Sequence, residues 1–166
     1  MTRPAVDPER DLSAYRPNAG VVLFNRQGLT WMGRRFGEAG PFVWQWPQGG
    51  MDAGEDPEEA ALRELYEETG ARRDQCERLS EIPHWLAYDF PPEVLATRKK
   101  NWTGQRQRWF AYRFHGEDAD FDLTAVPPQE FEAFDWVPLG DAPDLIIPWK
   151  RPVYEAVAEA FAPFAR

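Results

Sequence analysis

Residues 49–71 have the sequence GGMDAGEDPEEAALRELYEETGA, the stretch with the strongest local signals in the chain. Asp56 carries a side-chain acceptor suited to the N-cap of a helix, and Pro57 fits the first helical position. Gly70 is suited to end that helix, because glycine adopts a left-handed backbone without steric cost. We therefore expect a helix over residues 57–69, entered from a glycine-bearing loop.

Carboxylates gather on one side of this predicted helix. At about 100° per residue, Glu64, Glu67 and Glu68 fall within an arc of roughly 100°. Leu62 and Leu65 lie outside that arc, where a core contact would form. Three carboxylates this close repel one another by on the order of 3 kcal/mol per pair at an effective dielectric constant of about 20. The cluster favours a hard divalent cation, Mg²⁺ or Mn²⁺, held by oxygen ligands.

A solvated acidic face is the alternative interpretation of the same helix. Glu59 and Arg63 are spaced for an i,i+4 ion pair, and so are Glu68 and Arg72. Glu64 does not fit this view, because its own i+4 neighbour is Glu68. The preceding loop carries three glycines, which let its backbone approach a ligand or a metal closely.

Length and composition limit the class of protein. The chain has 166 residues, 43% of them hydrophobic and 14% aromatic, which suits one folded domain. No apolar run approaches the roughly 20 residues that span a bilayer, and the N-terminus lacks the apolar stretch of a secretory signal. The single cysteine, Cys76, excludes an internal disulfide framework. We expect a cytoplasmic protein with a flexible leader over residues 1–14.

The net charge of −9 is unevenly distributed. An acidic protein is a poor non-specific binder of duplex nucleic acid, because that affinity comes from neutralising phosphates. Six cations and no acid lie between residues 94 and 116, namely Arg98, Lys99, Lys100, Arg106, Arg108 and Arg113. Nine acids and no Lys or Arg lie between residues 114 and 149. A cationic patch beside acidic regions suits a small polyanion handled with a divalent metal.

The remaining elements follow from hydrophobic patterns and turn residues. We expect a hairpin of residues 21–24 and 29–32, strands over 43–46, 78–90, 105–114 and 132–137, and a terminal amphipathic helix over 148–161. Strands enclosing one helix and ending in another indicate an α+β or α/β sandwich.

Residues 49–71 resemble the Nudix box, G-x5-E-x7-R-E-U-x-E-E-x-G-U, in which U is a bulky apolar residue. The matching residues are Gly49, Glu55, Arg63, Glu64, Leu65, Glu67, Glu68 and Gly70, with the smaller Ala71 at the last position. The resemblance implies an α/β, Nudix-type αβα sandwich with a mixed central sheet. It implies a single hydrolase domain over residues 15–166 that cleaves nucleoside diphosphates linked to another group, using divalent cations.

The resemblance also implies roles for individual residues. Glu64, Glu67 and Glu68 would be metal ligands and catalytic residues, while Glu55 and Arg63 would brace the loop against the helix. Gly49 and Gly70 would support the motif. Glu130, which by itself fits a surface loop, resembles a distal catalytic glutamate and would be a further metal ligand or the general base. Glu64 is the other candidate base.

Blocks outside the motif resemble bacterial RNA pyrophosphohydrolases, which act in mRNA decay by removing pyrophosphate from 5′-triphosphorylated RNA. These blocks are residues 15–18, 34–37, 44–50, 104–110 and 149–151. Asymmetric dinucleoside polyphosphate hydrolases, which act on diadenosine tetraphosphate or pentaphosphate, have similar blocks, and residues 88–92 are closer to that branch. We expect an RNA 5′ end as the substrate, with the dinucleotide as the alternative, and no membrane or duplex DNA partner. A catalytically silent nucleotide-binding module is a third possibility, and the intact acidic set argues against it. No signal in the sequence defines an oligomeric state.

The resemblance and the positive charge of the basic loop together predict a set of substrate-binding residues. They are Arg16, Arg35, Tyr88, Lys100, Arg106, Trp149 and Lys150. Trp149 beside Lys150 is suited to stack a base and contact a phosphate, and Arg35 is suited to close the other face of the base. The alternatives are that Trp149 packs the terminal helix onto the sheet and that the basic loop is simply solvated.

Overall fold

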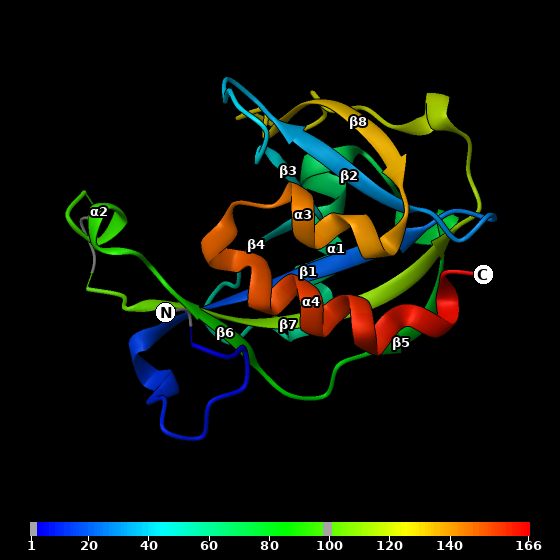
Figure 1. The fold of residues 1–166 in the computed structure, drawn as a ribbon. Coiled ribbons are helices and arrows are strands. Elements are labelled where there is room, and N and C mark those ends of the chain that lie inside the picture. The colour runs from blue at the N-terminus through cyan, green and yellow to red at the C-terminus, as the bar shows by residue number, and fades with distance from the viewer. Residues whose placement is uncertain (1–2, 98–100) are drawn as a thin grey trace.

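The computed structural model describes residues 3–97 and 101–166, which build one mixed sheet of eight strands (Figure 1). The strands are β1 (Tyr15–Phe24), β2 (Thr30–Arg35), β3 (Trp44–Gln45), β4 (Gln48–Gly50), β5 (Cys76–Glu81), β6 (Leu86–Asp89), β7 (Gly104–Phe114) and β8 (Phe131–Val137). The central order is β3-β2-β1-β7-β5, with β4 also on β1, β6 on β7 and β8 on β2. The β1–β7 pair is parallel and the other pairs are antiparallel.

Helices cover both faces of this sheet (Figure 1). Helix α1 (Pro57–Thr69) packs on one face over a core that includes Leu65 and Phe110. Helices α3 (Ala142–Leu145) and α4 (Arg151–Phe161) pack on the other face over a core that includes Trp109 and Val157. The short α2 (Pro92–Leu95) follows β6 and stands away from the sheet. The sandwich predicted from the sequence is confirmed.

Helix α1 has the predicted bounds because its end signals are local. The side chain of Asp56 accepts hydrogen bonds from the backbone N–H groups of Glu58 and Glu59. Gly70 has a left-handed backbone, with φ of 77°, and donates its N–H to the carbonyl of Tyr66. Both caps satisfy backbone groups that a helix end leaves without intrahelical partners.

The predicted strand over residues 78–90 is wrong, because the structure divides it into β5 and β6. Pro83 lies between them and has no N–H to contribute to a sheet ladder. Both pieces still pair with β7, so the error concerns continuity and not location.

The predicted hairpin is only partly correct. Its turn forms, and Asn25 donates its N–H to the carbonyl of Leu29. The strands then part after the single pair Phe24↔Thr30, since β1 continues along β7 and β2 along β8. The terminal helix is confirmed, with a 3₁₀ turn at Pro148–Lys150 before α4 begins.

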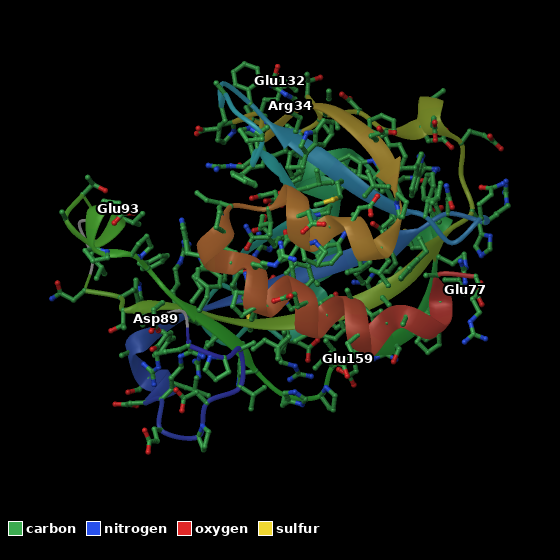
Figure 2. All side chains as sticks on the ribbon, in the orientation of Figure 1. Arg34, Glu77, Asp89, Glu93, Glu132 and Glu159 are labelled. Carbon is green, nitrogen blue, oxygen red and sulfur yellow. The ribbon has the colours of Figure 1, made fainter. Side chains whose placement is uncertain are left out.

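Residues 3–14 lie against the outer edge of β6. Arg10 is buried and donates from Nη1 to the carbonyl of Ala87 at 3.0 Å, while Ala87 donates its N–H to the carbonyl of Ala5 at 2.9 Å. Asp89, which Figure 2 shows beside this segment, accepts from the hydroxyl of Tyr15. The flexibility expected for residues 1–14 stays a prediction. Among the described helices, none has the length and apolar character that a bilayer crossing requires.

Candidate active site

A cavity of about 310 Å³ lies where α1 meets β1, β4 and the segment before β8. Glu64, Glu67 and Glu68 of α1 line it, and so does Glu130, which is far away in the sequence. The structure therefore brings all four predicted carboxylates to one cavity. Its other walls include the glycine-rich strand β4, the residues Val126–Pro128, and side chains of β1 and β7.

Arg63 connects the helix to the glycine-bearing loop. Its guanidinium donates to both carboxylate oxygens of Glu55, each at 2.9 Å, and to the carbonyl of Gly50 at 2.9 Å. The same group reaches Glu64 at 2.9 Å and Glu67 at 3.3 Å. These contacts lower the pKa of Glu55, chiefly through its hydrogen bond to Arg63, and keep Arg63 charged.

Gly49 leaves space for the carboxylate of Glu64. A Cβ atom at position 49 would overlap that carboxylate group, so any side chain there would displace it. The glycine is therefore required by close approach of the loop to the helix, and its own φ is not in the left-handed region.

Glu68 is the most unusual of the four carboxylates. One of its oxygens accepts the backbone N–H of Gln48 at 3.0 Å, while Oε2 is buried and has no hydrogen-bond partner among residues 3–97 and 101–166. Burial raises the pKa of Glu68 well above its usual range, and the charges of Glu64 and Glu130 raise it further. Burial also raises the pKa of Glu64, although Arg63 opposes that shift.

These properties fit a divalent cation. In the described part of the chain, no three carboxylate, histidine or cysteine groups already stand in a ready-made cage. The unpartnered oxygen of Glu68 and the crowding of Glu64 beside it are nevertheless what a hard cation would relieve. Each donor is a carboxylate oxygen, the ligand type that Mg²⁺ and Mn²⁺ prefer.

Hydrogen bonds at Glu130 and at nearby Glu132 hold this segment at the cavity. Phe36 donates its N–H to the carbonyl of Glu130 at 2.9 Å, and Gly37 donates its N–H to the side chain of Glu132 at 3.1 Å. Arg34 also pairs with Glu132 at 2.9 Å, at the edge of the sheet where Figure 2 labels both side chains. The end of β2 thus fixes the segment that carries Glu130.

The predicted substrate-binding residues are distributed over several places. Arg16 lines the cavity, with its guanidinium over Gly50. Tyr88, Trp149 and Lys150 form a cluster in which the Lys150 ammonium lies 5.3 Å from the ring centre of Trp149 and 5.5 Å from that of Tyr88. Trp149 also contacts Tyr88 edge-on, with ring centres 5.3 Å apart. Trp149 therefore packs against β6, as in the alternative interpretation, and its base-stacking role stays a prediction.

The other predicted contacts lie away from this cluster or outside the described residues. Arg35 stands at the end of β2, 3.5 Å from Glu38. Arg106 stacks on the ring of Trp85 at 4.5 Å and is not among the residues that line the cavity. Lys100 lies, with Arg98 and Lys99, outside the described residues.

The amide side chains at the cavity were not predicted to have a role. Asn18, Gln48 and Gln105 all line it, and Gln107 lies directly behind them. Gln105 and Gln107 alternate along β7 with the buried Trp109 and Ala111, and two amides on the core-facing side of a strand are a usable signal for a buried polar contact.

The fold and the site define a class of protein: an αβα sandwich in which carboxylates of one helix line a cavity suited to a divalent cation. Residues 14–157 match the model of the NUDIX domain. The chain is 53% identical to an RNA pyrophosphohydrolase of Caulobacter vibrioides over 160 residues, covering 95% of this chain and 92% of that one. It is 48% identical to an RNA pyrophosphohydrolase of Rhodopseudomonas palustris, covering 91% and 93%.

Solved structures agree on the fold. The dihydroneopterin triphosphate pyrophosphohydrolase of E. coli superposes with a TM-score of 0.68 at 20% identity, covering 88% of this chain and 98% of that chain. An Ap4A hydrolase of C. elegans superposes with a TM-score of 0.60 at 18% identity, covering 87% and 98%. The chain belongs to the Nudix family, whose members generally depend on divalent cations.

Proposed function

We propose that this protein is an RNA pyrophosphohydrolase that removes pyrophosphate from the 5′ end of triphosphorylated RNA. The observation that carries the proposal is the convergence of Glu64, Glu67, Glu68 and Glu130 on one cavity. Relatives that share 44–53% of their residues with nearly the whole chain bear that name. We further propose that the cation is Mg²⁺ or Mn²⁺ and that the protein acts in the cytoplasm.

Each group in the cavity has a part in this chemistry. A bound divalent cation supplies charge neutralisation at the phosphates and makes water a stronger acid. Glu64, Glu67 and Glu68 would hold the cation with Glu130 as a further ligand or the base, and Glu64 or Glu130 would accept the proton of the attacking water. The water oxygen forms a new bond to phosphorus, the bond between the α and β phosphates breaks, and pyrophosphate leaves. The RNA retains a 5′-monophosphate.

The cluster of Tyr88, Trp149 and Lys150 is suited to the nucleotide end of the substrate. A base can stack on an aromatic face, and an ammonium beside that face can meet a phosphate. Arg16 contributes a cation within the cavity itself. We propose that Arg35, Lys100 and Arg106 contact substrate beyond these residues.

A hydrolase of dinucleoside polyphosphates is the competing proposal, because its substrate also joins a nucleoside to a polyphosphate. Initial rates on 5′-triphosphorylated RNA and on diadenosine tetraphosphate, measured side by side with Mg²⁺, distinguish the two. We expect a higher kcat/KM for the RNA. A kcat/KM for the dinucleotide far above that for the RNA would replace our proposal with the competing one.

Substitution of Glu67 tests the catalytic site. Glu67→Gln removes the negative charge of a metal ligand with little change in side-chain size. We expect kcat to fall by about 10²-fold or more. Glu59→Gln is a matched control, since Glu59 lies on the same helix and pairs with Arg73 on the surface. Normal pyrophosphate release by the Glu67 variant would show that the assignment is wrong.

A further inference from the structure

Amide side chains from three strands meet directly behind the carboxylates. Gln107 of β7 is 2% exposed, and its amide nitrogen Nε2 faces three oxygens. These are Oδ1 of Asn18 at 3.1 Å, Oε1 of Gln48 at 3.0 Å and Oε1 of Gln105 at 3.3 Å. One buried amide therefore contacts three others, which belong to β1, β4 and β7.

Trp109 determines which way the Gln107 amide points. Its indole N–H, which can donate but never accept, lies 3.1 Å from Oε1 of Gln107. A rotated Gln107 amide would place its NH₂ against that N–H, a contact between two donors. The oxygen of Gln107 must therefore face Trp109, and its NH₂ must face the other three amides.

The orientation of the Gln107 amide fixes the orientation of the three neighbouring amides. Since the oxygens of Asn18, Gln48 and Gln105 face Gln107, their NH₂ groups point away from it. All three residues line the 310 Å³ cavity. Within residues 3–97 and 101–166 these NH₂ groups have no protein acceptor, and none of them is sealed from solvent. Asn18 is 1% exposed and Gln105 is 9% exposed, so both are buried side chains with free donors at the cavity.

We propose that Asn18, Gln48 and Gln105 form a donor-only cradle for the non-bridging phosphate oxygens of the substrate, and that Gln107 is the positioning residue that orients it. The inference rests on the proposed polyphosphate substrate. Ionised phosphate oxygens accept hydrogen bonds, so three NH₂ groups that line one cavity match them. Arg16 adds a positive charge at the same cavity, where the carboxylates alone would repel a polyphosphate.

Gln107→Met tests the positioning role. Methionine has a similar length, and it removes the donor that Asn18, Gln48 and Gln105 share, while the Tyr88 hydroxyl still donates to Gln105. We expect KM for triphosphorylated RNA to rise about tenfold, equivalent to about 1.4 kcal/mol, with kcat changed by less than about twofold. Thermal unfolding of the variant, measured alongside, identifies any loss of folded protein. An unchanged KM in the folded variant would overturn the proposal.

A pair of tryptophan variants separates orientation from packing. Trp109→Phe deletes the indole N–H that fixes Gln107, whereas Trp31→Phe deletes a fully buried indole whose N–H has no partner in the described part of the chain. Both variants lose the same ring area. We expect KM to rise several-fold for Trp109→Phe and to remain unchanged for Trp31→Phe. Equal KM values for the two variants would overturn the orienting role.

Side-chain amide signals in ¹H–¹⁵N spectra give a readout that does not depend on turnover. On titration with inorganic triphosphate and Mg²⁺, we expect the NH₂ signals of Asn18, Gln48 and Gln105 to shift, while that of Gln27 at the β1–β2 turn stays in place. If these signals shift but the protein does not hydrolyse RNA, the phosphate cradle is supported and the proposed function is wrong. If the protein hydrolyses RNA but the signals do not shift, the proposed function is supported and the cradle is wrong.

Discussion

Glu68 places a carboxylate where folding alone would not favour one. Its oxygen Oε2 is buried without a partner in the described residues, and its pKa is raised well above the usual range, chiefly by burial. A buried polar atom without a hydrogen bond costs roughly 1–3 kcal/mol. The residue therefore lowers the stability of the metal-free protein, and its chemistry at the cavity accounts for its presence.

We expect Glu68→Gln to stabilise the metal-free protein by about 1 kcal/mol and to reduce kcat by at least about 10²-fold. The amide oxygen can still accept the N–H of Gln48, while the buried charge is gone. The folded-state pKa of Glu68 lies above the unfolded value of 4.5, so its penalty disappears as the pH falls toward 4.5. Urea unfolding with a chelator at several pH values measures this. A variant less stable than wild type at pH 8 would contradict the argument.

Cys76 is expected to be chemically inert. Burial raises the pKa of its thiol to about 12, and the charge of Asp74 adds to that shift. At pH 8 only about 1 thiol in 10⁴ would be thiolate, compared with about a quarter for an unperturbed cysteine. Alkylation by iodoacetamide should therefore be slower than for glutathione by about 10³-fold. A comparable rate would show that the side chain is accessible and ionised.

At the scale of elements, the two ends of α1 explain why this helix could be predicted. Asp56, Pro57 and Gly70 act within a few residues of where they stand, so no distant partner had to be known. Strands depend on distant partners. Whether residues 21–24 pair with their neighbours or with β7 is decided by a segment about 90 positions later, and one sequence does not reveal that choice.

The residues of the site likewise fall into those that local sequence predicts and those that depend on distant partners. The carboxylates of α1 follow from helix periodicity and from the motif, and Glu130 came from the family resemblance alone. Gln107 reaches Asn18 and Gln48 across 89 and 59 positions. Such contacts depend on the register of β1 and β7. The positions of these amides in the sequence do not reveal that register.

The C-terminal end of α1 is expected to be sensitive to side-chain size. A Cβ at Gly70, whose φ is 77°, would lie 2.8 Å from the backbone nitrogen of Asp122, at the start of the segment that leads to Glu130. Gly54 has the same φ of 77°, and no atom of the described residues lies within 4 Å of such a Cβ. We expect Gly54→Ala to cost about 1 kcal/mol from backbone strain alone, and Gly70→Ala to cost about 2–3 kcal/mol.

Urea unfolding of the two alanine variants measures this difference. Because the Asp122 segment carries Glu130 to the cavity, we also expect Gly70→Ala to lower kcat. Equal losses of stability in the two variants would show that the contact with Asp122 has no energetic importance.

At the scale of the whole molecule, the net charge of −9 limits how the protein meets RNA. An acidic surface attracts a long polyanion weakly, so recognition should be confined to the first one or two nucleotides. We expect KM for triphosphorylated RNAs of 4 and 20 nucleotides to agree within about twofold, and duplex DNA not to compete. Steady-state kinetics at two salt concentrations measure this. A KM that falls steeply with RNA length would indicate an extended binding track.

The N-terminal segment has a consequence for how the molecule behaves in concentrated solution. It covers the outer edge of β6 through the hydrogen bond from Ala87 to Ala5, with Arg10 buried beneath it. An uncovered strand edge is a template on which a second chain can add. We therefore expect residues 3–14 to limit self-association, and we expect a shortened chain that begins at Tyr15 to aggregate more readily through that edge.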